Sequence, residues 1–120
     1  MSGYRELKVW IKAMDLAELV YGLARRLPKE EQYRITSQVL RSVVSIAANI
    51  AEGHQRGTRR EFAHVVSIAR GSLAETETFL ILTGRTGLLP PDDLAPALHL
   101  ADELSRMLFA LRRSLSKASP

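Results

Sequence analysis

Apolar residues recur at spacings of three and four positions in four separate stretches of the chain, and turn-forming residues lie between these stretches. This period places the apolar side chains on one face of an α-helix. The pattern therefore predicts four amphipathic helices, over residues 6–27, 36–52, 58–84 and 92–115. No pair of segments has the alternating pattern that two paired β-strands would show.

The ends of the first two helices follow from local side-chain chemistry. Pro28 cannot continue the first helix, because its ring clashes with the preceding turn and it lacks an amide hydrogen. Thr36 is expected to cap the second helix, and Gly53 is expected to end it in the left-handed conformation. The apolar stripes are Val9, Ala13, Leu16, Val20, Leu23 and Leu27 in the first helix, and Val39, Val43, Ile46 and Ile50 in the second.

The third helix begins with a capping pattern. The hydroxyl of Thr58 can accept the amide proton of Glu61, and the spacing of these two residues is that of a capping box. Gly84 or Gly87 is expected to end this helix. Its apolar side comprises Phe62, Val65, Val66, Ala69, Leu73 and Leu80, with Ile81 beside them.

The fourth helix follows Pro90 and Pro91. Asp92 or Asp93 is expected to cap it, and Pro96 is tolerated because it falls in the first turn. Its apolar stripe is Leu94, Leu98, Ala101, Leu104, Leu108, Leu111 and Leu115.

The connections between the predicted helices are about five to eight residues long, which favours antiparallel neighbours. The expected fold is all-α, an antiparallel up-down-up-down four-helix bundle in a single domain over residues 1–120. The composition agrees, since 46% of the residues are hydrophobic and 25% are charged. No window approaches the ~18 apolar residues of a membrane span and the N-terminus lacks an apolar signal segment, so we expect a cytoplasmic protein without membrane contact.

Candidate catalytic chemistry is sparse. The chain has no cysteine, which excludes disulfides, thiolate metal sites and a cysteine nucleophile. His54, His64 and His99 lie on different predicted elements, without the spacing of metal ligands. Nucleotide-binding fingerprints are absent. We therefore expect a protein that is not an enzyme and has no catalytic residue, metal or cofactor.

The formal net charge of +4 becomes informative once the charges are placed on the bundle. The end formed by the N-terminus, the second inter-helix loop and the C-terminus has nine basic residues against three acidic ones. Arginine binds phosphate oxygens through parallel hydrogen bonds, so this basic end is a candidate phosphate-binding surface. The residues are Arg5, Lys8, Lys12, Arg56, Arg59, Arg60, Arg112, Arg113 and Lys117, against Glu6, Glu52 and Glu61.

An alternative interpretation is that these cations serve solubility and complement the C-terminal dipoles of the helices. Arg59 and Arg60 favour the phosphate interpretation, because they lie in the first turn of a predicted helix, where the dipole disfavours cations.

Two polar rows lie beside the apolar stripes of the second and third helices. Solvated faces are one interpretation of the rows, but apolar residues flank both, and Gly71 in mid-helix costs about 1 kcal/mol relative to alanine. We hypothesise that the rows contact neighbouring subunits. They are Gln38, Arg41, Ser45, Asn49 and Glu52, and Ser67, Arg70, Gly71, Ala74, Glu75 and Thr78.

Several segments of the chain resemble a known family over residues 4–89. The matching segments are Lys8-Val9-Trp10, Lys12 to Leu16, Leu27 to Glu31, Thr36-Ser37-Gln38, Ser45-Ile46, Asn49 to Gly53, Arg56-Gly57, Glu61-Phe62 and Ile68 to Glu77. They resemble the bacterial four-helix bundle family of 23S rRNA intervening-sequence proteins, also labelled S23 ribosomal protein-like. Accessory proteins of diversity-generating retroelements are a related branch.

The resemblance implies a left-handed bundle, a homopentamer and nucleic-acid binding on basic surfaces. With the basic end, it makes Arg41, Arg56, Arg59, Arg60, Arg70, Arg112 and Arg113 the candidate nucleic-acid contacts. The candidate subunit contacts are Ser45, Asn49, Glu52, Gly71 and Glu75. The chain departs from the family at Leu40-Arg41, where paired arginines are common, and at Arg34, where glycine is common.

These observations predict a non-enzymatic, oligomeric protein that binds the phosphates of RNA or DNA without reading the base sequence, because few aromatic residues are available for stacking. The alternative is a protein-interaction scaffold, such as an accessory partner of a retroelement reverse transcriptase.

Overall fold

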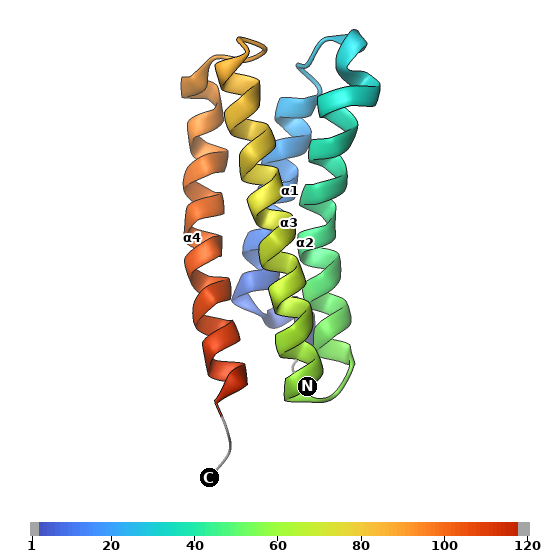
Figure 1. Ribbon diagram of the computed structural model, residues 1–120, viewed down its shortest axis with the longest axis vertical. Coiled ribbons are helices and arrows are strands. Elements are labelled where there is room, and N and C mark those ends of the chain that lie inside the picture. Colours follow the sequence, from blue (N-terminus) through green and yellow to red (C-terminus); the bar gives the residue numbers. More distant parts are fainter. Residues whose placement is uncertain (1–2, 118–120) are drawn as a thin grey trace.

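The computed structural model describes residues 3–117 and contains four long helices in this range. They are α1 (Lys8–Ala24), α2 (Ser37–Gln55), α3 (Arg59–Arg85) and α4 (Pro91–Ser116). α2 and α4 each pack against both α1 and α3, so the four helices surround one core (Figure 1). The all-α class and the four predicted helices are therefore confirmed.

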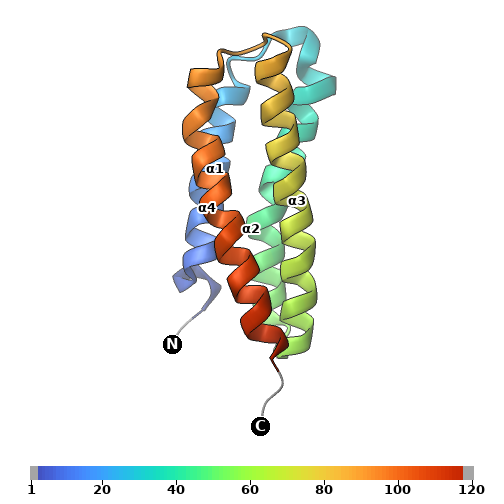
Figure 2. The ribbon, with the colours of Figure 1, turned by 60° about the vertical axis from the view of Figure 1, so that its left-hand side comes forward.

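Neighbouring helices run in opposite directions. In Figures 1 and 2 the chain ascends in α1 and α3 and descends in α2 and α4. Side-chain contacts agree: Arg59 at the start of α3 bonds to Ser114 near the end of α4, and Arg26 near the end of α1 bonds to Asp93 at the start of α4. The left-handedness of the bundle and its extent as one domain over 1–120 stay predictions.

The core consists largely of the apolar stripes that the sequence predicts. Leu16, Val20, Val43, Ile46 and Ile50 are fully enclosed, as are their counterparts on α3 and α4. Apolar burial of this kind is the main favourable contribution to folding. Within the described residues, no helix is long and apolar enough to cross a membrane.

One buried polar contact links α2 to α3. The hydroxyl oxygens of Ser42 and Thr76 lie 2.8 Å apart, and each also lies 3.0 Å from a carbonyl of its own helix. Each hydroxyl has one proton, so one hydroxyl donates across the interface while the other donates to its own backbone. Both groups are thereby satisfied in the core, where an unpaired hydroxyl would be costly.

Gly53 does not end α2, contrary to the sequence-based expectation. The helix continues to Gln55, and the residue with left-handed backbone is Gly57, at a φ of 92°. Gly53 is buried against α3, and a Cβ added to it would lie 2.8 Å from the Cβ of Val65. The glycine at this position is therefore needed for the close approach of two helices.

The predicted cap at Thr36 is also wrong. A wide turn over Gln32–Thr36, kinked at Arg34, leads directly into α2. The backbone of Thr36 is consequently already helical, and its hydroxyl makes no capping hydrogen bond. α1 is shorter than the predicted 6–27 at both ends. Leu7 before it has extended backbone, and a turn from Leu27 to Ala24 follows it, because the residue before Pro28 is disfavoured in the helical conformation.

The ends of α3 agree with expectation. The amide of Glu61 donates to the hydroxyl of Thr58 at 3.1 Å, and Gly87 follows the helix with a φ of 77°.

The start of α4 differs from the predicted cap. Pro91 is its first residue, and neither Asp92 nor Asp93 caps it, because proline is preorganised for a first helical position. The two aspartates lie within the first turn and complement the helix dipole there. Pro96 consequently falls in the second turn of α4 and not in the first.

Glu77 is a carboxylate whose environment opposes its ionisation. It is half-buried on α3, and its burial, followed by the negative charge of Asp102, raises its pKa above the ordinary value. A raised carboxyl pKa in the folded state means that stability falls as pH rises from the unfolded-state pKa through the folded-state pKa.

We predict that the packing at Gly53 makes it intolerant of even one methyl group. Gly53→Ala should lower the free energy of unfolding by about 1–3 kcal/mol, because the methyl overpacks the α2–α3 contact. Gly22→Ala is the matched control: nothing lies within 4 Å of its added Cβ, and it should raise the free energy of unfolding by about 0.5–1 kcal/mol through helix propensity. Urea denaturation measures both; equal effects would contradict the close approach.

We predict that Glu77→Gln raises the thermal midpoint at pH 7, because it removes a half-buried charge. The gain should shrink as pH falls and vanish below the unfolded-state pKa of about 4.3, where Glu77 is protonated in both states. Asp15→Asn, at an exposed position on α1, is the control and should show a smaller change. Melting curves at pH 7 and pH 3 test this; a gain that persists at pH 3 would exclude ionisation as its cause.

Candidate nucleic-acid interface

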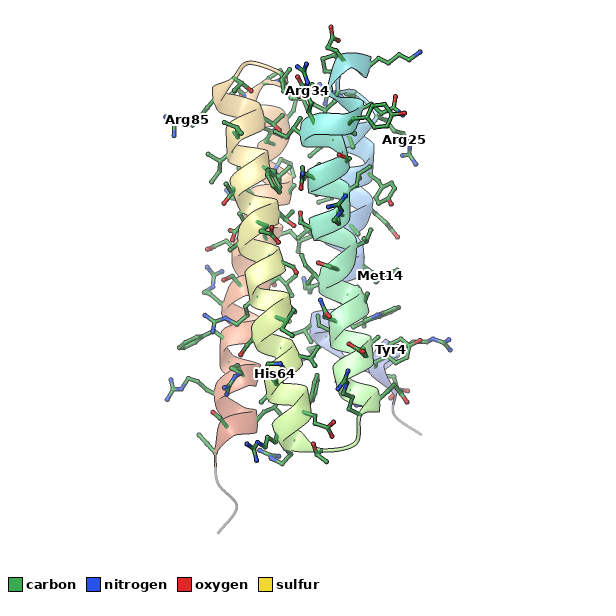
Figure 3. All side chains as sticks on the ribbon, turned by 45° about the vertical axis from the view of Figure 1, so that its right-hand side comes forward. Tyr4, Met14, Arg25, Arg34, His64 and Arg85 are labelled. Atoms are coloured by element: carbon green, nitrogen blue, oxygen red, sulfur yellow. The ribbon has the colours of Figure 1, made fainter. Side chains whose placement is uncertain are left out.

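A basic groove lies between the N-terminal part of α3 and the C-terminal part of α4. It has a volume of about 530 Å³. Figure 3 shows His64, one of its residues, at the lower end of α3. The groove is lined by Arg59, Arg60, Ala63, His64 and Ser67 of α3, by Arg112, Leu115 and Ser116 of α4, and by Lys117, which follows α4. We call these residues the basic groove.

The unequal lengths of the helices leave this region open. α1 has 17 residues, against 27 in α3 and 26 in α4. The Nζ of Lys12 lies 3.3 Å from a carboxylate oxygen of Glu103, which places the start of α1 beside the middle of α4. The lower end of α1 consequently lies above those of α3 and α4 in Figure 2. The last turns of α4 are therefore not covered by α1.

Two arginines are positioned by hydrogen bonds across the groove. Arg59 donates from Nη2 to the carbonyl of Ser114 at 2.6 Å, and Arg112 donates from Nε to the hydroxyl of Ser67 at 2.8 Å. The Arg59 contact satisfies a carbonyl in the last turn of α4, a structural role that complements the helix dipole. Each guanidinium has five N–H donors, so most of them stay available to a ligand.

The cations of the groove have no anionic partners within residues 3–117. None of Arg59, Arg60, Arg112 and Lys117 takes part in an ion pair there. The sequence explains this, because 62–74 and 104–117 contain no aspartate or glutamate. The groove is therefore a region of uncompensated positive charge, which attracts anions.

Arg70 and Arg113 adjoin the groove through an aromatic ring. Their Cζ atoms lie 5.1 and 6.0 Å from the centroid of the Phe109 ring, which is exposed. These distances fall within the range of cation–π attraction. Five of the seven predicted nucleic-acid contacts, three in the groove and these two beside it, therefore lie together.

Arg56 and Arg41 do not join this cluster. Arg56 donates to a carboxylate oxygen of Glu52 at 3.0 Å and lies 3.9 Å from one of Glu61. The hydrogen bond and the charge of Glu52 raise the pKa of Arg56. Ser42 pairs with Thr76 of α3, so the neighbouring Arg41 lies level with that part of α3. At a rise of 1.5 Å per residue along α3, this position is roughly 27 Å from Arg59.

The structure also divides the basic end that the charges predict. Lys12 is paired with Glu103 in the middle of the bundle, and Arg5 lies 5.6 Å from the ring centroid of Tyr4 near the start of α1. His64 of the groove was not predicted as a site residue, and Ser67 was predicted only as a member of the polar row on the third helix. The pattern that could have identified them is the absence of acidic residues from two segments that face each other.

The predicted subunit contacts lie on α2 and α3 with different exposure. Ser45 and Asn49 are half-buried, whereas Glu52, Gly71 and Glu75 are exposed. The Ser45 hydroxyl donates to the carbonyl of Ser42 at 2.7 Å. A Cβ added at Gly71 would have nothing within 4 Å, so packing inside the protomer does not require glycine there.

A second groove, apolar in character, lies between α1 and α2. It has a volume of about 600 Å³. Tyr4, Met14 and Arg25 lie along this side of the bundle in Figure 3. We call it the apolar groove; it is lined by Tyr4, Trp10, Met14, Ala17, Glu18, Tyr21 and Arg25, and by Val44, Ala47, Ala48 and Ala51. The pattern of apolar residues along the chain did not predict this groove.

Comparison with known proteins agrees with the fold. A solved structure described as a protein of unknown function from the S23 ribosomal protein family of Bacteroides thetaiotaomicron is similar to this chain, with a TM-score of 0.81 and 27% identity. The match covers 88% of this chain and 98% of that one. No curated protein matches the chain. The family model of the 23S rRNA-intervening sequence protein matches residues 5–110, and the chain therefore belongs to this family.

Proposed function

We propose that the protein binds nucleic acid, RNA in particular, through phosphate contacts in the basic groove, and that it does so as a non-enzymatic oligomer. The observation that supports this most directly is a set of cations that have no acidic partner among residues 3–117: Arg59, Arg60, Arg112 and Lys117. The family name, which refers to intervening sequences of 23S rRNA, points to an rRNA-related role.

The chemistry of the groove suits a phosphate backbone. Guanidinium groups bind phosphate oxygens with charge-assisted, often paired hydrogen bonds. Arg59 and Arg112 are held in place by bonds to Ser114 and Ser67 and retain free donors. Binding would release counterions from the nucleic acid and so depend strongly on salt. Contacts of this kind carry no base-sequence information.

We further propose that the protein self-associates, with a homopentamer as the expected state. Exposed apolar side chains support this, among them Val44 on α2 and Ile68 on α3, at 42% and 45% exposure. Gly71 supports it too, because a mid-helix glycine without a neighbour in its own protomer leaves room for close approach by another subunit.

A second candidate function is that of a protein-interaction scaffold, for which a retroelement reverse transcriptase is the partner expected from the resemblance. The apolar groove favours this candidate, since an apolar surface lined by Trp10, Met14 and Tyr21 is of the kind that binds protein. The two candidates also differ in genomic context: a gene within an rRNA gene favours the first, and one beside a reverse transcriptase gene favours the second.

We predict salt-dependent binding of structured RNA that requires the groove. If four phosphates are neutralised, the logarithm of the binding constant should fall against that of salt concentration with a slope of about −3. Arg59→Glu combined with Arg60→Glu should abolish binding in an electrophoretic titration. Arg25→Glu combined with Arg85→Glu makes the same charge change at the opposite end of the bundle (Figure 3) and should leave most of the binding intact.

Two outcomes of this titration would contradict the proposal. The first is an absence of binding by the wild-type chain at low salt, which would favour the scaffold function. The second is an equal loss of affinity in both double variants, which would show that net charge, and not the groove, determines binding.

We predict that Gly71→Ala separates folding from assembly. Inside a protomer the methyl group contacts nothing, so the free energy of unfolding of a monomer should rise by about 1 kcal/mol. At a subunit contact the same methyl should overpack the interface and weaken self-association about tenfold. Sedimentation equilibrium measures the association, with Gly22→Ala as the control; a strictly monomeric wild type at micromolar concentration would exclude the oligomer.

A further inference from the structure

Phe109 differs from the other phenylalanines of the chain. Phe62 and Phe79 are partly buried and pack against the core, whereas Phe109 is 48% exposed. It lies on α4 outside the stripe that includes Leu104 and Leu108. A single exposed apolar residue is common on protein surfaces. The position of this one, beside the basic groove, is what requires explanation.

The ring lies one helical turn from Arg112 of the groove and from Arg113 beside it. Phe109 precedes Arg112 by three residues and Arg113 by four, and residues at these spacings share one face of a helix. Arg112 reaches Ser67 across the groove, and Arg70, one turn further along α3, reaches the Phe109 ring. The aromatic surface and the phosphate-binding donors therefore form one continuous strip along the α3–α4 interface.

We propose that Phe109 is a stacking platform for an unpaired base of single-stranded nucleic acid whose phosphates lie in the basic groove. This inference rests on the proposed function and adds the class of ligand to it. Single-strand sites in general combine a positively charged groove along the backbone with aromatic side chains on which bases stack. Both components are present here within one turn of helix.

Stacking on Phe109 selects for strandedness and not for base identity. In a duplex the base faces are covered by neighbouring base pairs, so a surface ring cannot reach them, whereas loops, bulges and ends offer unstacked bases. A phenyl ring has no hydrogen-bonding group with which to distinguish one base from another. The site is therefore expected to prefer unpaired segments and to tolerate any sequence.

The two arginines beside the ring have different parts in this arrangement. Arg70 is half-buried and its Cζ is the nearer, at 5.1 Å from the ring centroid, so it supports the ring from α3. Arg113 is exposed and its Cζ is 6.0 Å away, so its side chain is free to turn toward a phosphate when a base stacks. Base stacking is stronger than an exposed cation–π contact, so a base can displace Arg113.

Binding of RNAs of equal length, one single-stranded and one duplex, tests the proposal with Phe109→Ala. The variant should lose about tenfold in affinity for the single strand, keep its affinity for the duplex, and keep the slope of its salt dependence. Ile81→Ala is the matched control, because Ile81 is also 48% exposed and lies on α3 away from the groove. Circular dichroism checks that both variants are folded.

A fluorescence measurement gives a second readout that does not depend on affinity. Phe109→Trp in a Trp10→Phe background leaves one tryptophan, at the proposed platform. Its emission should be quenched when the single strand binds and stay unchanged when the duplex binds. An oligonucleotide that lacks bases but keeps the sugar-phosphate backbone should bind without quenching.

The possible failures are distinguishable. If the wild type binds neither RNA at low salt, the proposed function fails and the platform with it. If the wild type binds RNA but Phe109→Ala lowers affinity for both ligands equally or for neither, only the platform is overturned. Quenching by the duplex as strong as by the single strand overturns it as well.

Discussion

The arrangement of the bundle depends on the close contact between α2 and α3. Gly53 allows the two backbones to approach until an added Cβ would lie 2.8 Å from that of Val65, and the Ser42–Thr76 hydroxyl pair meets in the core further along. Both contacts favour one register between the two helices. A shift of α3 by one residue would cause a clash at Gly53 and would leave the hydroxyls of Ser42 and Thr76 without their partners. Together they set the register of α3, whose first turns line the candidate site.

The basic groove is a consequence of this register and of helix length. α3 and α4 continue beyond the start of α1, so the first turns of α3 pack on the last turns of α4 and leave charged side chains exposed. The bonds from Arg59 to Ser114 and from Arg112 to Ser67 join the two helices there. The same contacts satisfy a carbonyl near the end of α4 and fix the orientation of two guanidinium groups.

The two grooves on opposite parts of the protein have different chemistry. In the part of the chain that the structure describes, the cations of the basic groove have no acidic partners and an exposed ring lies beside them, which suits a flexible anionic polymer. The apolar groove between α1 and α2 suits a protein surface. The two grooves do not share a lining residue, so the two proposed functions are physically compatible.

The sequence alone was sufficient for the helices, their apolar faces and the cap at Thr58, because these depend on periodicity and on neighbours within one turn. It also located most of the basic cluster. Only the tertiary structure decided that Gly53 lies inside the last turn of α2 and packs against α3, that Arg56 is paired and that Arg41 lies far from the groove. These outcomes depend on the register between helices, and that register is set by contacts between residues distant in the chain.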